Sequence, residues 1–211
     1  MNPKLITKIM RDLAITGLPG LKKGRRNLVN VATYEDLVNR EFHAKTTNAL
    51  WLTDITEHPT REGKVYCCCV LDIYSRKVVG WAIDRNCEAT LVNDALSMAA
   101  RSRLTSPSTV IHSDHGSQFT SEAFTSMLRE AGVAISMDGV GRAIDNVFIE
   151  RLWRTLKYDH VYLNPANSGN ACRDGITEFL TYYNEERPHS SLNDATPDEV
   201  YYQSRLNERA A

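Results

Sequence analysis

The sequence has 211 residues, 42% of them hydrophobic, which is enough chain to bury a core and a composition typical of globular proteins. No apolar run approaches the roughly 20 residues needed to cross a bilayer, and no segment resembles a signal peptide. We therefore expect a cytoplasmic protein without a membrane partner.

The net charge of −1 hides an uneven distribution of charge along the chain. Residues 1–48 hold nine Lys or Arg and four acids, a net charge of +5, which leaves −6 on the remainder. Within this basic region lies K-K-G-R-R, with the cations Lys22, Lys23, Arg25 and Arg26. Such an arm can contact DNA phosphates without a fixed fold, and a solvated basic linker explains it equally well.

The hydrophobic pattern predicts the elements of the first half of the chain. Helical spacing indicates a helix over residues 4–14, glycines and a proline indicate a linker over 15–30, and residues 34–42 suggest a turn or short helix. The compact domain is expected to start near Ala44. Three strands are then predicted, the last two joined as a hairpin, over residues 49–56, 65–73 and 78–83.

After the third strand, helices and strands alternate. The spacing predicts helices over 90–103 and 121–131, the second ended by Gly132, and strands over 109–112 and 133–135. The expected fold is α/β: a mixed five-stranded sheet with an antiparallel edge and helices on both faces. The cysteines form no C-x-x-C pair, and three of them, residues 67–69, alternate between the faces of a strand, so we expect reduced core residues.

Two aspartates occupy positions in the predicted sheet where a carboxylate needs explanation. Asp114 follows the fourth strand in I-H-S-D-H-G-S-Q-F, at the edge where sites gather in open α/β sheets, although a turn explains it equally well. Asp54 lies inside the first strand, in W-L-T-D-I-T, where burial of a carboxylate is costly without a partner. If strands one and four are neighbours, the two carboxylates lie close together and need a cation between them.

A further helix follows D-G-V-G and carries a third acid, Glu150. Apolar residues recur every four positions and form the predicted buried stripe: Ile144, Phe148, Leu152 and Leu156. Opposite this stripe, one exposed face collects Asn146, Glu150, Arg154 and Lys157. A solvated face with ion pairs is the alternative interpretation.

Three carboxylates with open coordination positions suit magnesium or manganese better than zinc. His112 and His115 suggest zinc, but no cysteine or third histidine stands at ligand spacing. We expect these two histidines to support the site or to face DNA.

Three segments together resemble the catalytic core of bacterial insertion-sequence transposases related to retroviral integrases. They are W-L-T-D-I-T, H-S-D-H-G-S-Q-F and D-N-V-F-I-E-R-L-W-R-T-L-K. The family's second aspartate and its glutamate are separated by 35 residues, as residues 115–149 separate Asp114 from Glu150 here. Lys157 matches the family's basic residue, and Y-N-E-E-R-P-H-S-S-L resembles its C-terminal signature. The resemblance extends from about Asn48 to Val200.

This resemblance implies a ribonuclease-H-like fold and metal-dependent phosphoryl transfer on DNA. Asp54 would bridge two Mg²⁺ ions, with Mn²⁺ as the alternative metal, while Asp114 and Glu150 would each complete one site. Water would be the nucleophile in strand cleavage and a 3′-hydroxyl in strand transfer. Lys157 and Arg154 would hold phosphates, with Asn146 and Arg142 in the same groove.

The resemblance also implies an organisation and partners. Residues 1–45 would be a basic N-terminal helix and linker, in which residues 6–17 resemble the tail of a truncated helix-turn-helix region. Residues 46–165 would form the core, and 166–211 its C-terminal helical part. The partners would be the element ends and target DNA, further copies of the chain, and an upstream-frame polypeptide. DNA binding would bring the protein to the nucleoid.

Two alternatives to an active strand-transferase stay open: a catalytically silent DNA-binding or dimerising remnant, and a general ribonuclease-H-like nuclease. In the C-terminal signature, Tyr182 and Tyr183 are candidate core residues, whereas Arg187 and His189 either end a helix or lie near DNA or a partner. All three tryptophans are expected in the core rather than stacked on bases: Trp51, Trp81 and Trp153.

Overall fold

The structure, a computed structural model, describes residues 3–13, 34–39, 41–102, 108–137 and 147–210. The chain divides into two units, residues 1–30 and 31–211. The first contains α1, Pro3–Asp12, which confirms the helix predicted there. The basic segment at residues 22–26 lies outside the described residues. No helix in the described part of the chain is long and apolar enough to span a membrane.

The second unit is built on a five-stranded mixed sheet in the order β3-β2-β1-β4-β5. β1 pairs antiparallel with β2, β2 antiparallel with β3, and β4 parallel with both β1 and β5. The predicted fold class is therefore confirmed. The strands are β1 Leu50–Thr60, β2 Gly63–Asp72, β3 Val78–Asp84, β4 Val110–Ser113 and β5 Ala134–Met137.

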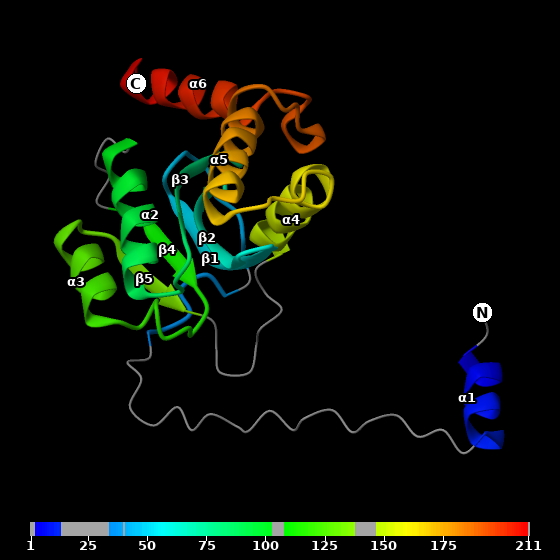
Figure 1. The fold of residues 1–211 in the computed structure, drawn as a ribbon. Helices are drawn as coiled ribbons and strands as arrows, with labels where there is room; N and C mark the ends of the chain where they lie inside the picture. The colour runs from blue at the N-terminus through cyan, green and yellow to red at the C-terminus, as the bar shows by residue number, and fades with distance from the viewer. Residues whose placement is uncertain (1–2, 14–33, 40, 103–107, 138–146, 211) are drawn as a thin grey trace. The chain divides into compact units, whose positions relative to one another are not determined.

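Helices cover both faces of the sheet, with α2 and α3 on one side and α4 and α5 on the other (Figure 1). Their bounds are α2 Ala89–Ser102, α3 Glu122–Glu130, α4 Val147–Leu156, η1 Lys157–Val161, α5 Gly169–Glu185, η2 Ser190–Leu192 and α6 Pro197–Ala210. A cluster of buried side chains lies under each pair of helices. Successive side chains of β2 point to opposite faces of the sheet and so join both clusters: Cys67 and Cys69 face α4 and α5, and Cys68 faces α2. All five cysteines are free, as predicted.

Local chemistry explains where several elements end. The hydroxyl of Ser121 accepts from Phe124 N and caps the start of α3, while Gly132, at φ +64°, follows its end as predicted. β1 runs four residues beyond its predicted end because Thr60 still pairs with Gly63 of β2. Residues 34–39 form a turn rather than a helix and bond to β5, since Leu37 N donates to Ser136 Oγ.

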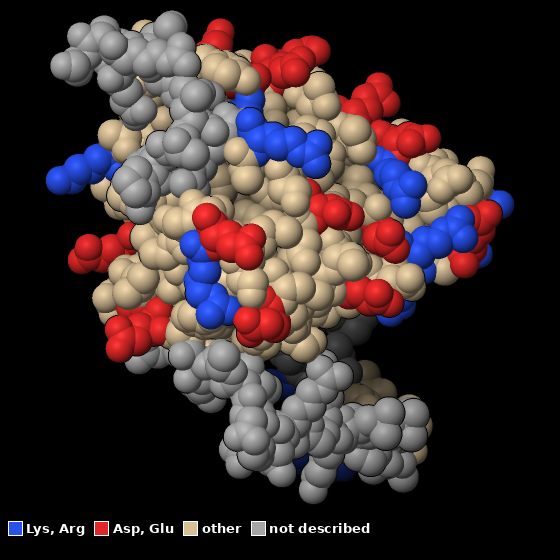
Figure 2. Space-filling view, turned by 90° about the vertical axis from the view of Figure 1, so that its left-hand side faces the viewer, with Lys and Arg blue, Asp and Glu red and all other residues tan. Residues whose placement is uncertain are grey.

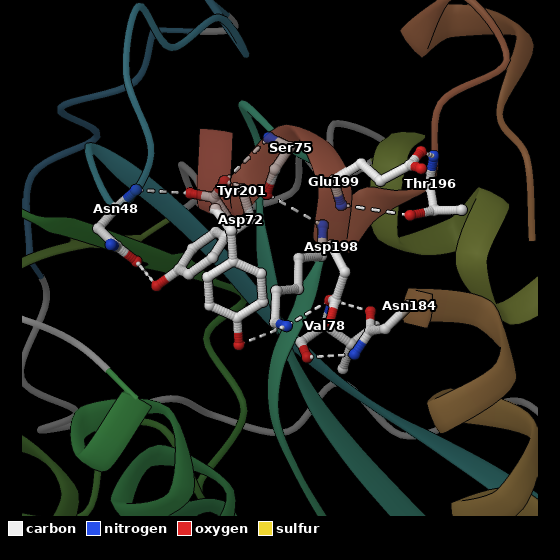
Figure 3. A network of polar contacts seen from close by, with 11 residues as sticks. Asn48, Asp72, Ser75, Val78, Asn184, Thr196, Asp198, Glu199 and Tyr201 are labelled. Atoms are coloured by element: carbon white, nitrogen blue, oxygen red, sulfur yellow. Dashed lines mark hydrogen bonds and ion pairs between the residues drawn. The ribbon is translucent and has the colours of Figure 1, made fainter. Parts of the chain in front are cut away.

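The C-terminal helices are attached to the sheet by a buried polar network (Figure 3). Lys77, at the end of the β2–β3 hairpin, pairs with Asp198 of α6. The Tyr201 hydroxyl donates to Asn48 Oδ1, and the Asn184 amide of α5 bonds to both backbone groups of Val78. Residues more than 100 positions apart thus hold α5 and α6 against the sheet.

The surface on the α2–α3 side carries acidic and basic side chains interspersed, without a broad patch of either sign among the described residues in view (Figure 2). A DNA duplex is a uniformly negative partner and favours a surface of the opposite sign. The described residues in this view therefore form no surface of the sign that a DNA duplex favours.

Candidate active site

Parallel pairing between β1 and β4 brings the two predicted aspartates to one edge of the sheet. The register sets Leu50 beside Val110, Trp51 beside Ile111 and Leu52 beside His112. Continued by two residues, this register places Asp54 opposite Asp114. The Asp54 side chain points to the face that α4 covers, as that of Leu52 does, and the charge of Asp114, just beyond the end of β4, acts on it.

Asp114 stands directly after β4, and its backbone makes the turn that its sequence suggested. Its Oδ1 accepts from Gly116 N at 2.9 Å, an Asx-type turn that fixes the carboxylate at the strand end. A Cβ on Gly116 would lie 2.9 Å from that same oxygen, so a side chain there would displace it. Asp114 can therefore be both a turn residue and a site residue, because the turn holds its exposed carboxylate in position.

Glu150 lies in the first turn of α4 and is exposed, as predicted. The buried stripe of the helix is rotated from the predicted one: it consists of Ile149, Leu152, Trp153 and Leu156. Phe148 is only partly buried, and Ile144 lies outside the described residues. The prediction was wrong in spacing because a helix packing on a sheet follows i, i+3, i+4, i+7 rather than every fourth residue.

Trp153 is the residue of this site that the sequence did not reveal. Its indole Nε1–H donates to Asp54 Oδ2 at 2.8 Å, across 99 positions of sequence. The side chain is 7% exposed, so the prediction of a core tryptophan is confirmed, and its polar edge orients the aspartate. The hint in the sequence was its spacing of three residues from Glu150, because residues three apart lie near one another on a helix surface.

The acids act on one another electrostatically. Burial raises the pKa of Asp54, and the charges of Asp114 and Glu150 raise that pKa further, while hydrogen bonds from Trp153 and Ile55 N oppose the rise. Asp114 and Glu150 are thus close enough for their charges to act on the carboxylate of Asp54. A cation at this edge would relieve both the burial cost and the repulsion.

The carboxylates do not form a closed metal cage. Among the described residues, no three His, Cys, Asp or Glu side chains are clustered tightly enough to hold one ion. Mg²⁺ differs from zinc here, because it keeps several waters and is often bound by only one or two carboxylates together with substrate phosphates. An open pair of oxygen ligands fits that chemistry, whereas it would not fit structural zinc.

An open groove of about 700 Å³ lies along the exposed side of α4. Glu150 and Arg154 both line it, so these two predicted neighbours are brought together. Lys157 is half-buried and begins the π-helical turn that continues α4. Burial is the main cause that lowers the pKa of His58, and the charge of Lys157 lowers it further. The prediction that Lys157 shares a helix face with Glu150 assumed the α-helical spacing of about 100° per residue. A π-helical turn is wider, so that spacing no longer applies from Lys157 onward.

The histidines of the central segment differ in their placement. His112 is 1% exposed, bonds through Nδ1 to Ser136 Oγ at 2.9 Å and packs edge-on against Phe42, which favours the predicted supporting role over a direct DNA contact. Helices cover both faces of β4, so its consecutive residues Ile111, His112 and Ser113 are all buried, whereas His115 lies beyond the end of the strand. His115 is half-buried beside Asp114. Asn146 and Arg142 lie outside the described residues.

The C-terminal signature is split between core and surface. Tyr183 is 5% exposed, which confirms it as a core residue, whereas Tyr182 is 44% exposed and does not belong to the core. Adjacent helical residues point about 100° apart, and the buried side of α5 runs through Tyr183 and Asn184 and leaves Tyr182 outside it. Arg187 pairs with Asp159 at 3.2 Å and lines the groove that holds Glu150.

Comparison with known proteins gives this arrangement a family. Two models, each described as an integrase core domain, match residues 44–143 and 131–197. The transposase for insertion sequence element IS629 of Shigella sonnei is 31% identical over 96% of this chain and 71% of its own length. The chain belongs to the integrase-core family of insertion-sequence transposases.

Other relatives agree with this assignment. The transposase for insertion sequence element IS904 of Lactococcus lactis is 35% identical over 77% of this integrase-core chain. The matched region spans 64% of that relative, a little under two thirds. A putative transposase for element IS150 of Escherichia coli is 28% identical over 98% of this chain and 73% of its own length.

Solved structures confirm the fold independently of sequence. The catalytic core of HTLV-2 integrase in complex with magnesium superposes with a TM-score of 0.61 at 15% identity, covering 75% of this chain and 99% of that one. The catalytic core of BIV integrase gives 0.59 at 21% identity, covering 77% and 99%. The integrase-core chain therefore has the mixed sheet and helices of retroviral integrase cores, the ribonuclease-H-like fold.

Proposed function

We propose that this integrase core catalyses divalent-metal-dependent cleavage and transfer of DNA strands, the chemistry of an insertion-sequence transposase. The observation that carries the proposal is the meeting of Asp54, Asp114 and Glu150 at one sheet edge, where their charges act together on the pKa of Asp54. The names of the relatives and the magnesium complex of the HTLV-2 core support the same chemistry.

Each carboxylate has a distinct role in this proposal. Asp54 would be a ligand of both Mg²⁺ or Mn²⁺ ions, while Asp114 would complete the ligands of one and Glu150 those of the other. When bound, the metals would lower the pKa of an attacking water or 3′-hydroxyl and stabilise the leaving oxygen. The chain itself orients Asp54 through Trp153 and Asp114 through the Gly116 turn. Pre-oriented ligands reduce the reorganisation needed as the reaction proceeds.

DNA is the proposed substrate, both as element ends and as target. The proposed phosphate contacts are Arg154 of α4 and Lys157 of η1. His115 would lie close to the DNA strand where that strand passes Asp114. Asn146, Arg142 and the basic segment at residues 22–26 keep their predicted DNA contacts as proposals. We further propose assembly of several copies on DNA, association with the nucleoid, and cooperation with an upstream-frame polypeptide.

The test is a strand-transfer assay with the full chain, duplexes carrying the precleaved termini of the element that encodes it, a supercoiled target plasmid and Mg²⁺. We expect joined products from the parent protein and a loss of at least about 100-fold in Asp54→Asn and Glu150→Gln, since each removes a ligand charge. The matched control is Glu130→Gln, an exposed acid in the last turn of α3, which is expected to join normally.

Metal binding by calorimetry separates chemistry from folding. Ca²⁺ or Mg²⁺ affinity is expected to fall in Asp54→Asn while the circular dichroism spectrum stays that of the parent protein. If the parent chain joins no ends, either alone or with its upstream-frame polypeptide, it is a silent remnant rather than a transferase. Cleavage of DNA without sequence preference or joining would instead indicate a general nuclease.

A further inference from the structure

A second pocket, of about 380 Å³, lies beside the groove that contains Glu150. Arginines from three elements line it: Arg76 from the turn between β2 and β3, Arg151 from α4, and Arg187 from the segment after α5. Arg151, Thr155 and Arg187 also line the neighbouring groove, so the two depressions are continuous. We call this second depression the arginine pocket.

Acids offset only part of the positive charge of the arginine pocket, and the charge of Asp72 acts on Arg76. Arg76 lies 3.9 Å from the centroid of the Phe148 ring, and its buried Nη1 has no hydrogen-bond partner among the described residues. Among the described residues, Arg187 forms an ion pair with Asp159. Within the described part of the chain Arg151 forms no salt bridge with a carboxylate, and Asp194 is the one acid among the residues that line the pocket.

His189 responds to the positive field of this cluster. Burial lowers its pKa to about 4, and the charges of Arg187, Arg151 and Arg76 contribute to the same shift. The ring packs edge-on against Tyr183 at 4.7 Å, and its Nε2 is buried without a partner among the described residues. Three cations and a neutral histidine with an unsatisfied nitrogen therefore converge on one cavity. Such a cavity favours an anion that accepts several hydrogen bonds.

We propose that the arginine pocket binds a backbone phosphate of the DNA strand that passes Glu150. The proposal rests on the proposed function, because it extends the path of the strand beyond the acidic edge. Guanidinium groups match the geometry of phosphate oxygens, and the hydroxyls of Ser190 and Ser191 add donors. Continuity with the Glu150 groove favours a phosphate, since a strand lying there carries one at every nucleotide.

The test measures binding of a fluorescent single-stranded oligonucleotide to the full chain in Ca²⁺. The variant is Arg151→Gln, which removes an exposed charge of α4 without breaking an ion pair within the described residues. We expect affinity to fall about tenfold, the effect of one charge-assisted hydrogen bond. The slope of log affinity against log salt concentration should decrease by about 0.7, the value for one phosphate contact to a single strand. Arg101→Gln, at an exposed arginine in the last turn of α2, should change neither quantity.

Oligonucleotides with one neutral methylphosphonate locate the contact. At one linkage, the methylphosphonate should weaken DNA binding by the parent protein about tenfold. It should hardly weaken binding by Arg151→Gln, because that variant has already lost the contact between Arg151 and this phosphate. An unchanged salt slope in Arg151→Gln, or no linkage that couples to it, overturns the proposal. Competition by millimolar inorganic phosphate without such coupling shows a free-anion site and overturns it as well.

The two remaining outcomes are also decisive. If Arg151→Gln changes the oligomeric state measured by light scattering while DNA binding is unchanged, the pocket holds an acidic side chain of a second copy, which contradicts the phosphate assignment. Strand joining by the parent protein is measured separately. Coupled phosphate binding without joining would therefore leave the pocket established and refute the proposed function.

Discussion

At the scale of single residues, the acidic edge depends on how one carboxylate is held. Asp54 is half-buried in β1, where its charge is disfavoured by burial and by two other acids. The indole N–H of Trp153 opposes that cost and holds Oδ2 of the carboxylate. Replacing a group that orients a metal ligand typically lowers metal affinity by about 10- to 100-fold.

Trp153→Phe is expected to weaken Mn²⁺ binding about tenfold, because Asp54 loses its orienting donor while the ring still fills the core. Calorimetric titration of the full chain with Mn²⁺ gives the affinity. Trp51→Phe is the matched control: Trp51 also donates its indole N–H to a side chain, Asn48 Oδ1, on the opposite face of β1. Both variants should lose about 1 kcal/mol of unfolding free energy. Equal Mn²⁺ affinity in the two would contradict the role of Trp153.

His58 provides a second residue-level test. Both ring nitrogens are buried without a partner in the described part of the chain, and burial together with the charge of Lys157 lowers the pKa of His58 to about 4. A histidine whose pKa is lower in the folded state than in the unfolded state contributes to the stability of the folded protein at pH values above its unfolded pKa of about 6.5. That contribution, about 3 kcal/mol, is lost as the pH falls from about 6.5 to about 4.

Replacing His58 by Leu should therefore flatten the decline of unfolding free energy between pH 6.5 and pH 4. Urea denaturation at several pH values measures that decline. Asp54 and Asp72 have raised pKa values and contribute in the opposite direction, but both are present in the two proteins, so the comparison isolates His58. Parallel profiles for the parent and the variant would show that His58 is not the group that titrates.

At the scale of elements, the sheet and its helices fit through a few close approaches. β3 packs directly against α2, and Gly80 is the position where the two backbones meet. A Cβ there would lie 2.2 Å from the Ala95 carbonyl oxygen and 2.7 Å from Ala99 N, both of which belong to the helix backbone. Neither atom can move without shifting α2, so glycine is required.

Gly80→Ala is expected to destabilise the protein by about 3 kcal/mol or more, measured by urea denaturation, since overpacking against backbone cannot be relieved by a side-chain rotation. Gly132→Ala serves as comparison. That position has φ +64° but open space around it, so the cost is conformational and about 1 kcal/mol. A smaller effect at Gly80 than at Gly132 would show that α2 can move away from β3.

At the scale of the whole molecule, charged side chains couple the C-terminal helix to the sheet. The side chains of Lys77 and Asp198 are 10% and 20% exposed, so each is partly desolvated and depends on the other. The ring of Tyr202 lies 4.6 Å from the Lys77 ammonium and adds a favourable contact with the cation (Figure 3 shows the wider network).

Asp198→Ala should cost about 3 kcal/mol of unfolding free energy, because it leaves the Lys77 ammonium buried without its partner. The double variant Lys77→Met with Asp198→Leu should recover most of that loss. The comparison pair is Glu57–Lys64, an exposed ion pair of 2.8 Å, where Glu57→Ala should have little effect because water screens the charges. Similar costs at the two sites would exclude α6 docking as the cause.

The sequence alone determined in what order strands and helices follow one another along the chain, and how the cysteines alternate across β2. It also identified three acids as candidate metal ligands. These follow from local periodicity and from residue chemistry, because a strand or a helix orients its side chains at fixed intervals. Hydrogen bonding in the sheet extended β1 to Thr60, and packing rotated the buried stripe of α4. Both depend on neighbours that periodicity does not describe.

Only the tertiary structure decided which distant side chains meet. Trp153 reaches Asp54 across 99 positions, His112 is enclosed rather than presented to DNA, and three arginines from separate elements surround one cavity. Each result depends on how the helices cross the sheet and on which side chains fill the space between them. Packing sets these angles through many weak contacts, so no single stretch of sequence specifies them.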